Sequence, residues 1–358
     1  MEKKVMFLCH GAGNGGAERV ITTLANKFIE RGYSVLLVTT KISENEYSIS
    51  DQIDRIVIES KKSTVLGRTI DRIMEIRRCL KDYSPKCVIS FSAIPNIQVL
   101  FASIGLKTKV IISERTDPSR YPESYIGKAL RAIMYRFANK IVFQTKDAQK
   151  YFSKRIIDNS IIIPNPVRED LPNRFLGERE KKIVGIGSLG EQKNWVVALK
   201  ACEIFFKKHE DYKMVIFGEG PNRNELESFI KNNVILKNRV FLPGFSSEAV
   251  EYMNNAMIYV SSSDYEGISN SMLEALATGV PTICTDCPVG GAKQFIKNNV
   301  NGILINVGNY HAMADAMTRI ADNIEFADAL SNESIKIREE LKIDNIVDIW
   351  EREVELCE

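Results

Sequence analysis

Short apolar runs alternate with longer amphipathic segments along the chain. In the first half this pattern predicts helices at residues 17–31 and 66–82, and strands at residues 5–9, 34–39, 87–91, 110–113 and 141–144. Apolar positions in the first helix repeat with the spacing of one helical face, and Gly32 is suited to end it. Because strands that alternate with helices form βαβ units, the pattern predicts a parallel, doubly wound α/β sheet.

The same alternation restarts in the second half after an interruption. The segment 161–167 contains two prolines, which break regular structure, and the polar stretch 168–182 is the expected linker. Beyond it, strands are expected at residues 183–186, 213–217, 239–242, 257–260 and 282–285.

A last helix is expected at residues 344–357, with Asp344 as its N-cap and Trp350 on its apolar face. We therefore expect two Rossmann-like domains, residues 1–168 and 182–343, with a C-terminal helix at about 344–358 that packs back on the first. Ligands of such sheets bind beyond the carboxyl ends of the strands, so two facing domains would form a cleft between their loops.

The composition fits a cytoplasmic protein of two globular domains. Of the 358 residues, 44% are hydrophobic and 26% are charged. The apolar runs fall short of the roughly 18–20 residues that span a bilayer, and the N-terminus lacks the apolar core of a signal peptide. Seven scattered cysteines favour free thiols. Cys284 and Cys287 form a lone C-x-x-C, which we interpret as a strand end running into a turn, with a redox or zinc site as the weaker alternative.

Charge is divided unevenly between the two halves. Residues 1–170 contain 28 Lys and Arg against 18 Asp and Glu, whereas residues 171–358 contain 20 against 28. A basic first half suits phosphates or anionic lipid headgroups, with scattered solvated charge as the alternative. Nucleic acid is not expected, because no recognition motif or interleaved aromatic residues are present.

The basic residues gather in two segments, which are Arg68, Arg72, Arg77, Arg78 and Lys81 in the first and Lys128, Arg131, Arg136 and Lys140 in the second. We expect them to dock the protein peripherally on the inner face of the cell membrane. The first segment also contains apolar side chains, for which a place in the core is the alternative: Leu66, Ile70, Ile73 and Leu80.

A glycine-rich loop follows the first predicted strand of each domain. Both Gly11-x-Gly13-x-x-Gly16 and Gly185-x-Gly187-x-x-Gly190 fit the dinucleotide fingerprint. That fingerprint also requires an acidic residue about 20 positions on, which neither domain supplies at that place. Nicotinamide chemistry is therefore disfavoured. The loops are expected either to bring backbone N–H groups close to a phosphate or sugar, or only to make tight turns.

Two carboxylates and a lysine are placed to meet one ligand in the second domain. Glu266 lies in the loop after the strand at 257–260, and Glu274 lies about one and a half turns into a helix capped by Ser269 or Asn270. Carboxylates accept hydrogen bonds from sugar hydroxyls, and helix N–H groups donate to phosphate. Lys193 follows the second glycine loop, so it is expected at the same sheet edge. Taken singly, each of the three fits a solvated surface residue.

Together these segments resemble the retaining GT-B glycosyltransferases of family GT4, over nearly the whole chain. Glu266 and Glu274 match the E-x7-E signature of that family, and Gly15-Gly16-Ala17-Glu18 is similar to its N-terminal loop. Further matches are the segments 163–166, 192–194, 217–221, 277–281 and 301–302. The resemblance implies a GT-B fold whose first domain binds the acceptor and whose second domain binds a nucleotide sugar.

The resemblance also implies roles for individual residues. Glu274 would bind the donor ribose, Glu266 the transferred sugar, and Lys193 the leaving diphosphate. The other donor-binding residues would act through backbone N–H groups or through the space that a missing side chain leaves: Gly15, Gly16, Gly267, Ile268 and Ser269.

Two positions depart from the family pattern. Ser188, a further expected donor-binding residue, stands where many members have an arginine, so one cation for the diphosphate is missing. Arg115 stands where many members have a histidine. We expect Arg115 either to supply the missing positive charge, as a third catalytic residue beside Lys193 and Glu266, or to serve the acceptor.

The activity implied by the resemblance is transfer of a hexose or N-acetylhexosamine from a UDP-sugar, with retention, to a lipid-linked or oligosaccharide acceptor of a bacterial surface glycan. The acceptor is expected to be linked to polyprenyl diphosphate. Because the chain has no D-x-D motif, no metal and no cofactor besides the co-substrate are expected. The alternatives are a UDP-sugar epimerase of GT-B fold, with His10 as its acid–base group, and a non-catalytic partner subunit.

Overall fold

The computed structural model describes residues 3–13, 15–43 and 45–356, which form two compact units. Unit 1 comprises the chain up to Pro166 together with the segment from Asp344 onward, and unit 2 comprises Val167–Ile343. The stretch 168–182, expected as a linker, belongs to unit 2, and its last residues already form the start of a strand.

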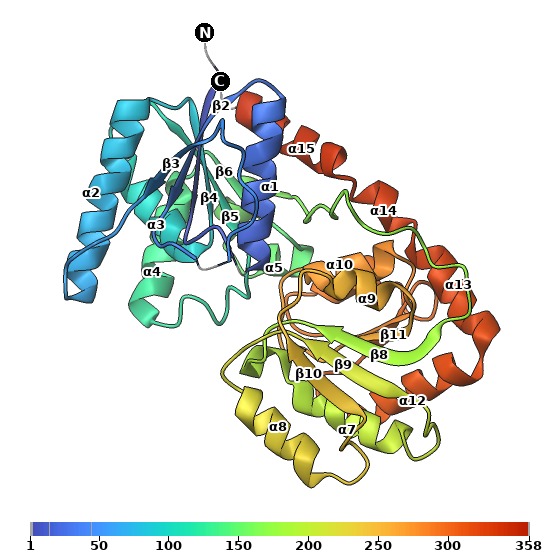
Figure 1. The fold of residues 1–358 in the computed structure, drawn as a ribbon. Coiled ribbons are helices and arrows are strands. Elements are labelled where there is room, and N and C mark those ends of the chain that lie inside the picture. Colours follow the sequence, from blue (N-terminus) through green and yellow to red (C-terminus); the bar gives the residue numbers. More distant parts are fainter. Residues whose placement is uncertain (1–2, 14, 44, 357–358) are drawn as a thin grey trace. The chain divides into compact units, whose positions relative to one another are not determined.

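Unit 1 is built on a seven-stranded parallel sheet in the order β3-β2-β1-β4-β5-β6-β7. Helices cover both faces of this sheet, with α2, α3 and α4 on one face and α1 on the other (Figure 1). The strands are β1 (Lys4–Cys9), β2 (Ser34–Thr39), β3 (Asp54–Val57), β4 (Cys87–Phe91), β5 (Lys109–Glu114), β6 (Lys140–Phe143) and β7 (Ser160–Ile162). The helices are α1 (Gly16–Glu30), α2 (Val65–Tyr83), α3 (Ala93–Ala102), α4 (Tyr125–Met134), α5 (Lys146–Lys150), α6 (Lys154–Asp158) and the 3₁₀ helix η1 (Tyr135–Phe137).

The last helix, α15 (Ile343–Leu356), packs on unit 1. The Trp350 ring is fully buried, with its centroid 5.6 Å from that of Phe91. At the surface, Arg31 at the end of α1 pairs with Asp348 and Glu351 of α15, each at 2.6 Å. Burial of the apolar face and this ion-pair group together fix the helix on the first sheet.

Unit 2 is built on a six-stranded parallel sheet in the order β10-β9-β8-β11-β12-β13. The strands are β8 (Glu180–Ile186), β9 (Lys213–Phe217), β10 (Val240–Gly244), β11 (Ala256–Ser261), β12 (Thr282–Thr285) and β13 (Ile303–Ile305). The helices are α7 (Trp195–Phe205), α8 (Arg223–Asn232), α9 (Ala249–Asn254), α10 (Asn270–Ala277), α11 (Gly291–Phe295), α12 (Tyr310–Asp322), α13 (Ile324–Ser334), α14 (Ile337–Glu340) and the 3₁₀ helix η2 (Glu191–Lys193). Alternate strand residues such as Met214, Ile216, Ile258 and Val260 form an apolar core on one face of the sheet, together with residues of α7 and α12.

The expected α/β class with two doubly wound parallel sheets is confirmed. Strands β2, β4, β9 and β12 have the bounds that the apolar runs predicted. The pattern missed β3, an edge strand whose side chains are mostly exposed and which therefore lacks an apolar run. It also missed α3, which is apolar on nearly every side because it is almost completely buried.

The structure corrects the expected membrane surface of unit 1. Arg131 is buried, donates to the carbonyls of Pro118 (2.7 Å) and Tyr121 (2.5 Å), and lies 3.7 Å from the Glu114 carboxylate. Arg77 donates to two carbonyls at the end of α3. These two basic residues tie unit 1 together internally, so they were wrongly assigned to the docking surface.

The apolar residues of helix α2 differ in their exposure to solvent. Leu80 is buried in the core, as the alternative interpretation expected, but Leu66 and Ile70 are exposed. The helix α2 therefore presents apolar side chains to the solvent near its N-terminus.

Candidate active site

Two loops meet at the carboxyl edge of the sheet of unit 2. The loop 187–193 follows β8, and the loop 262–269 follows β11. These strands are neighbours, and the strand order reverses between them, with β9 and β10 on one side and β12 and β13 on the other. Connections that leave in opposite directions diverge at such a point, which makes it the usual ligand site of a doubly wound sheet.

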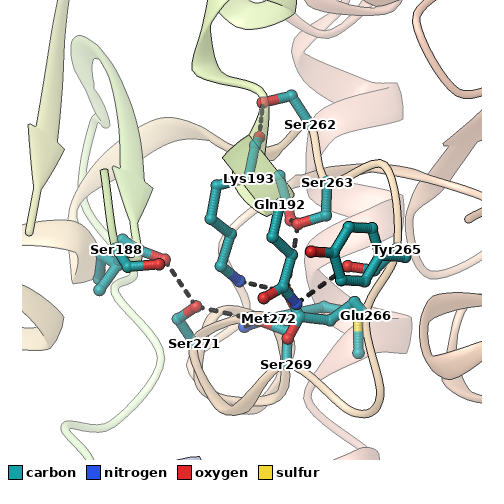
Figure 2. Close-up of polar contacts among 12 residues, drawn as sticks. Ser188, Gln192, Lys193, Ser262, Ser263, Tyr265, Glu266, Ser269, Ser271 and Met272 are labelled. Carbon is teal, nitrogen blue, oxygen red and sulfur yellow. Dashed lines mark hydrogen bonds and ion pairs between the residues drawn. The ribbon is translucent and has the colours of Figure 1, made fainter. Parts of the chain in front are cut away.

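Hydrogen bonds hold the two loops to each other (Figure 2). The Gln192 side chain donates to the Tyr265 carbonyl (3.0 Å), and the Asp264 N–H donates back to the Gln192 carbonyl (2.9 Å). The Ser262 hydroxyl donates to the carbonyl of Lys193 (2.8 Å). The backbone that carries Lys193 is therefore fixed by residues of the neighbouring loop.

Lys193 and Glu266 form an ion pair across this junction (Figure 2). The Ser263 hydroxyl also donates to the Glu266 carboxylate, at 3.2 Å. The two charged side chains are only 11% and 19% exposed, so water screens them weakly and their fields act strongly on a nearby group. The structure thus brings together the lysine and the first glutamate that the sequence placed at one sheet edge.

Helix α10 begins directly after the Glu266 loop. Ser269 is its N-cap, and the Ser269 hydroxyl accepts from the Met272 N–H at 3.4 Å. The Ser271 hydroxyl donates to the Ile186 carbonyl at the end of β8 (2.9 Å), which anchors the helix to the sheet. The first N–H groups of a helix have no partner within it, so this end favours an anion.

Glu274 lies in the second turn of α10 and is buried. The Glu274 carboxylate interacts electrostatically with Arg168, at the start of unit 2. The hydrogen bond to Asp170 raises the pKa of the Arg168 guanidinium most, and the charge of Glu274 raises it further. The predicted ribose-binding glutamate therefore lies near a cation of the same unit.

Sequence reasoning missed one wall of this site, which is formed by the loop 286–290 after β12 and the first residue of α11. A Cβ on Gly291 would lie 1.7 Å from the carbonyl oxygen of Gly267, so only glycine permits this close approach. Val289 has φ of +76°, a conformation rare for a β-branched residue. Cys287 lines a small cavity beside Glu266. The two consecutive glycines Gly290 and Gly291 are the feature of the sequence that could have predicted this close approach.

The remaining predicted residue of this edge is Ser188. Its side chain is exposed, and its carbonyl accepts from the Trp195 indole at 3.0 Å. Ser188 therefore brings no charge to the site.

Unit 1 carries the other predicted residues. Gly15 is the N-cap of α1 and Gly16 is its first residue. A Cβ on Gly15 would lie 1.9 Å from a carboxylate oxygen of Glu18, so the missing side chain leaves room for that group. Glu18 is half-buried, and its partial desolvation raises its pKa. His10, at the end of β1, contacts the Thr40 hydroxyl at 2.7 Å, and burial lowers the pKa of its imidazole.

Arg115 follows β5 and is buried in unit 1. Its guanidinium lies 3.8 Å from the Phe91 ring centroid and 5.6 Å from that of Trp350, and it donates to Asn165 at 2.9 Å. Its Nε and Nη2 have no hydrogen-bond partner among the residues that the structure describes. Burial lowers the pKa of Arg115 to about 9, so it is still charged at neutral pH.

The C-x-x-C pair behaves as a strand end running into a turn. Cys284 lies in β12 and Cys287 just beyond it, both as buried free thiols. Burial raises the pKa of Cys287 to about 12. Among the described residues, no three His, Cys, Asp or Glu side chains gather in a group suited to a metal ion.

Comparison with protein-family models gives two matches that together span most of the chain. Residues 14–171 match the model described as Glycosyltransferase Family 4, and residues 167–337 match Glycosyl transferases group 1.

Two enzymes of Campylobacter jejuni are each 28% identical to this chain. One is an α-1,4-N-acetyl-D-galactosaminyltransferase named for the acceptor GalNAc-α-(1→4)-GalNAc-α-(1→3)-diNAcBac-PP-undecaprenol, with 97% of both chains covered. The other is an N-acetylgalactosamine-N,N'-diacetylbacillosaminyl-diphospho-undecaprenol 4-α-N-acetylgalactosaminyltransferase, with 93% of this chain and 94% of the relative covered.

Among solved structures, HepE of Anabaena in complex with UDP and glucose superimposes with a TM-score of 0.82 at 14% identity, covering 99% of this chain and 100% of the other. TarM of S. aureus superimposes with a TM-score of 0.79 at 15% identity, covering 99% of both chains. In the part of the chain that the structure describes, no helix is both long and apolar enough to cross a bilayer.

Proposed function

Because this chain is a family GT4 glycosyltransferase with the GT-B fold, we propose that it transfers an N-acetylhexosamine or hexose from a UDP-sugar to a polyprenyl-diphosphate-linked bacterial surface glycan. The observation that carries the proposal is the Lys193–Glu266 pair in front of helix α10. The names of the Campylobacter relatives support the acceptor class, and those of the solved neighbours support UDP.

The proposed donor pose follows from the chemistry of each group. The diphosphate binds at the N-terminus of α10, near the N–H groups of Gly267, Ile268 and Ser269, with the Lys193 ammonium beside it. Glu266 accepts hydrogen bonds from hydroxyls of the transferred sugar, and Glu274 accepts from the ribose. Lys193 then exchanges part of its contact with Glu266 for the phosphate oxygens.

We place the reaction on one face of the sugar, so that the anomeric configuration is retained. The bond between the anomeric carbon and the diphosphate oxygen breaks, and the acceptor hydroxyl oxygen bonds to the same face of that carbon. The hydroxyl proton passes to the departing diphosphate. Lys193 and the helix N-terminus stabilise the negative charge that develops there, which is the work a metal ion performs in other transferases.

The acceptor is assigned to unit 1, with Arg115 as its candidate cation. A lipid-linked acceptor is held in the membrane, so the enzyme would work peripherally at the inner face of the cell membrane. Within the described part of the chain, no group accepts a hydrogen bond from Nε or Nη2 of the buried Arg115, so both remain available to an anionic group.

A ligand panel followed by turnover tests this function. UDP and one or more UDP-sugars should raise the melting temperature, whereas GDP- and ADP-sugars should not. Free UDP should then appear only when a polyprenyl-diphosphate-linked glycan is added. Binding of a UDP-sugar with no turnover on any such acceptor would favour a non-catalytic partner subunit. Interconversion of UDP-sugars without an acceptor would favour an epimerase, for which the comparisons give no support.

A further inference from the structure

Helix α4 and the turn η1 that follows it expose large apolar side chains on one face. Ile126, Ile133 and Phe137 are 75%, 53% and 67% exposed. Their spacing of seven and four residues places them on one helical stripe. Single exposed apolar residues are ordinary, but several of them at helical spacing form a continuous apolar surface, which commonly marks an interaction site.

Helix α2 carries a second stripe of the same kind. Leu66, Ile70 and Met74 are 70%, 50% and 64% exposed and follow one another at intervals of four. Leu80 lies two heptads after Leu66 on nearly the same side of α2 and is buried in the core with Ile76, so this side is covered in the C-terminal half of the helix and exposed in the N-terminal half. Ile70 and Met74 lie farther round the helix, where a helix that only covered its sheet would be polar.

The two stripes belong to one region of unit 1. Helix α3 packs against both α2 and α4, and all three cover the same face of the sheet (Figure 1). Helices that follow parallel strands begin at the carboxyl edge of the sheet, so the N-terminal halves of α2 and α4 both lie toward that edge. We call the six side chains Leu66, Ile70, Met74, Ile126, Ile133 and Phe137 the α2–α4 face.

Basic residues surround the α2–α4 face. The segment 61–83 contains seven Lys and Arg against three Asp and Glu, and the segment 119–137 contains four against one. Arg77 and Arg131 are committed to internal hydrogen bonds, but Arg78 and Arg136 are exposed beside the stripes. Two copies of such a face would repel one another, whereas an anionic surface with an apolar interior would attract both the charges and the stripes.

We propose that the α2–α4 face inserts into the headgroup region of an anionic bilayer, with its apolar side chains in the acyl boundary and its basic residues on the headgroups. The choice of a bilayer as partner rests on the proposed function, because a polyprenyl-linked acceptor is presented there. Insertion differs from attraction by charge alone, since it buries apolar area and therefore persists when salt screens the charges.

Cosedimentation with vesicles of phosphatidylglycerol and phosphatidylethanolamine tests insertion. The double variant Ile126→Ser/Phe137→Ser should bind at least about 100-fold more weakly, the loss expected when two large apolar side chains no longer leave water. The matched control is Val234→Ser/Phe245→Ser in unit 2, whose side chains are 92% and 64% exposed and which should bind like the wild type. Part of the wild-type binding should survive at 1 M salt.

Fluorescence locates the contact directly. In a Phe137→Trp variant, anionic vesicles should shift the emission to the blue, and brominated lipids should quench it. A Phe245→Trp variant should show neither change. The natural Trp195 and Trp350 are buried and give a constant background.

Three results would overturn the proposal. These are wild-type binding by the double variant, equal losses in both double variants, or binding that vanishes entirely at 1 M salt. A lipid-free dimer that the α2–α4 substitutions abolish, with vesicle binding unchanged, would assign the face to a second copy instead.

Activity separates this proposal from the proposed function. The double variant should keep its turnover on a water-soluble, short-chain acceptor and lose it on an acceptor embedded in vesicles. If the wild type inserts but transfers sugar to no acceptor, the proposed function fails and the inserting face stands. If it transfers sugar equally to both acceptors without binding vesicles, the face fails and the function stands.

Discussion

Each unit places a basic residue at the carboxyl edge of a parallel sheet, but the two residues have opposite surroundings. Lys193 of unit 2 pairs with the Glu266 carboxylate, and hydrogen bonds from the neighbouring loop hold its backbone. Arg115 of unit 1 lies against the Phe91 and Trp350 rings with Asn165 as its hydrogen-bond acceptor. Among the residues that the structure describes, no carboxylate pairs with it.

The two units of similar fold therefore hold a cation ready to bind an anionic group in two different ways. The charge of Lys193 is already compensated, so an incoming diphosphate competes with Glu266 and gains mainly from fixed geometry. The charge of Arg115 is desolvated and uncompensated, so an anionic group that contacts it removes an existing penalty. Lys193 is thus held in place by polar contacts, and Arg115 by burial against aromatic rings.

Replacing the lysine should give the largest effect. Lys193→Ala should lower kcat/KM by about 10²–10³, the loss expected for one preorganised charge at the leaving group, and it leaves Glu266 without its cation. Initial rates of UDP release would measure this. The matched control is Lys181→Ala, which breaks an ion pair with Asp211 on the surface of the same unit and should not change the rate. A loss below about threefold for Lys193→Ala would remove Lys193 from the mechanism.

The sequence predicted that Lys193 and Glu266 lie at one sheet edge, and the reason is topological. Lys193 and Glu266 each follow a predicted strand, and the carboxyl ends of parallel strands share one edge. Their direct contact required β8 and β11 to be neighbours, which the order of elements alone did not determine. The wall formed by Gly291 and Val289 was missed for the same reason, since it depends on β12 lying beside β11.

Charged residues were harder to place than strands. The pattern of residues 128–140 is basic and partly apolar, and nothing in it distinguishes the buried Arg131 from the exposed Arg136. Arg131 faces inward because Glu114 and two carbonyls satisfy it there, and those partners are distant in sequence. Burial of Arg115 likewise depends on Trp350 of the last helix.

Glu266 of unit 2 and Glu114 of unit 1 form a second contrast, which the pH dependence of stability can test. Glu266 is partly exposed beside Lys193, whereas Glu114 is fully buried and accepts from the Tyr135 hydroxyl at 2.9 Å. Burial raises the pKa of Glu114 from 4.5 to about 7, although Arg131 opposes the rise. The folded state therefore keeps a proton through this window that the unfolded state has lost, so the free energy of unfolding should fall as pH rises from 4.5 to 7.

Glu114→Gln should remove that dependence. The free energy of unfolding in urea, measured from pH 4.5 to 8 for both proteins, should show a difference that changes by on the order of 2–3 kcal/mol across the window and is level above it. Comparing the two proteins cancels the other carboxylates. Parallel curves would mean that Arg131 keeps Glu114 ionised throughout.

The contrast between the two cations is sharpened by Arg115→Met. An apolar side chain can pack against the Phe91 and Trp350 rings, so the melting temperature should stay the same or rise. If Arg115 binds an anionic part of the acceptor, kcat/KM should still fall about 10-fold to 30-fold, because a charge-assisted hydrogen bond is lost. Arg120→Met, at an exposed position of the same loop, is the control. Unchanged activity at unchanged stability would make Arg115 a packing residue.

The smallest expected effect is that of removing divalent cations. We propose that Lys193 and the N-terminus of α10 supply the positive charge that metal-dependent transferases obtain from an ion held by a D-x-D motif, which this chain lacks. Enzyme dialysed against EDTA should therefore keep most of its rate of UDP release, and added Mg²⁺ or Mn²⁺ should change that rate less than about twofold. In the same assay neither ion should rescue Lys193→Ala, because the proposed mechanism uses no metal ion that could replace the lost ammonium. Complete loss of wild-type activity in EDTA, restored by Mg²⁺ or Mn²⁺, would transfer that role from Lys193 to a bound metal.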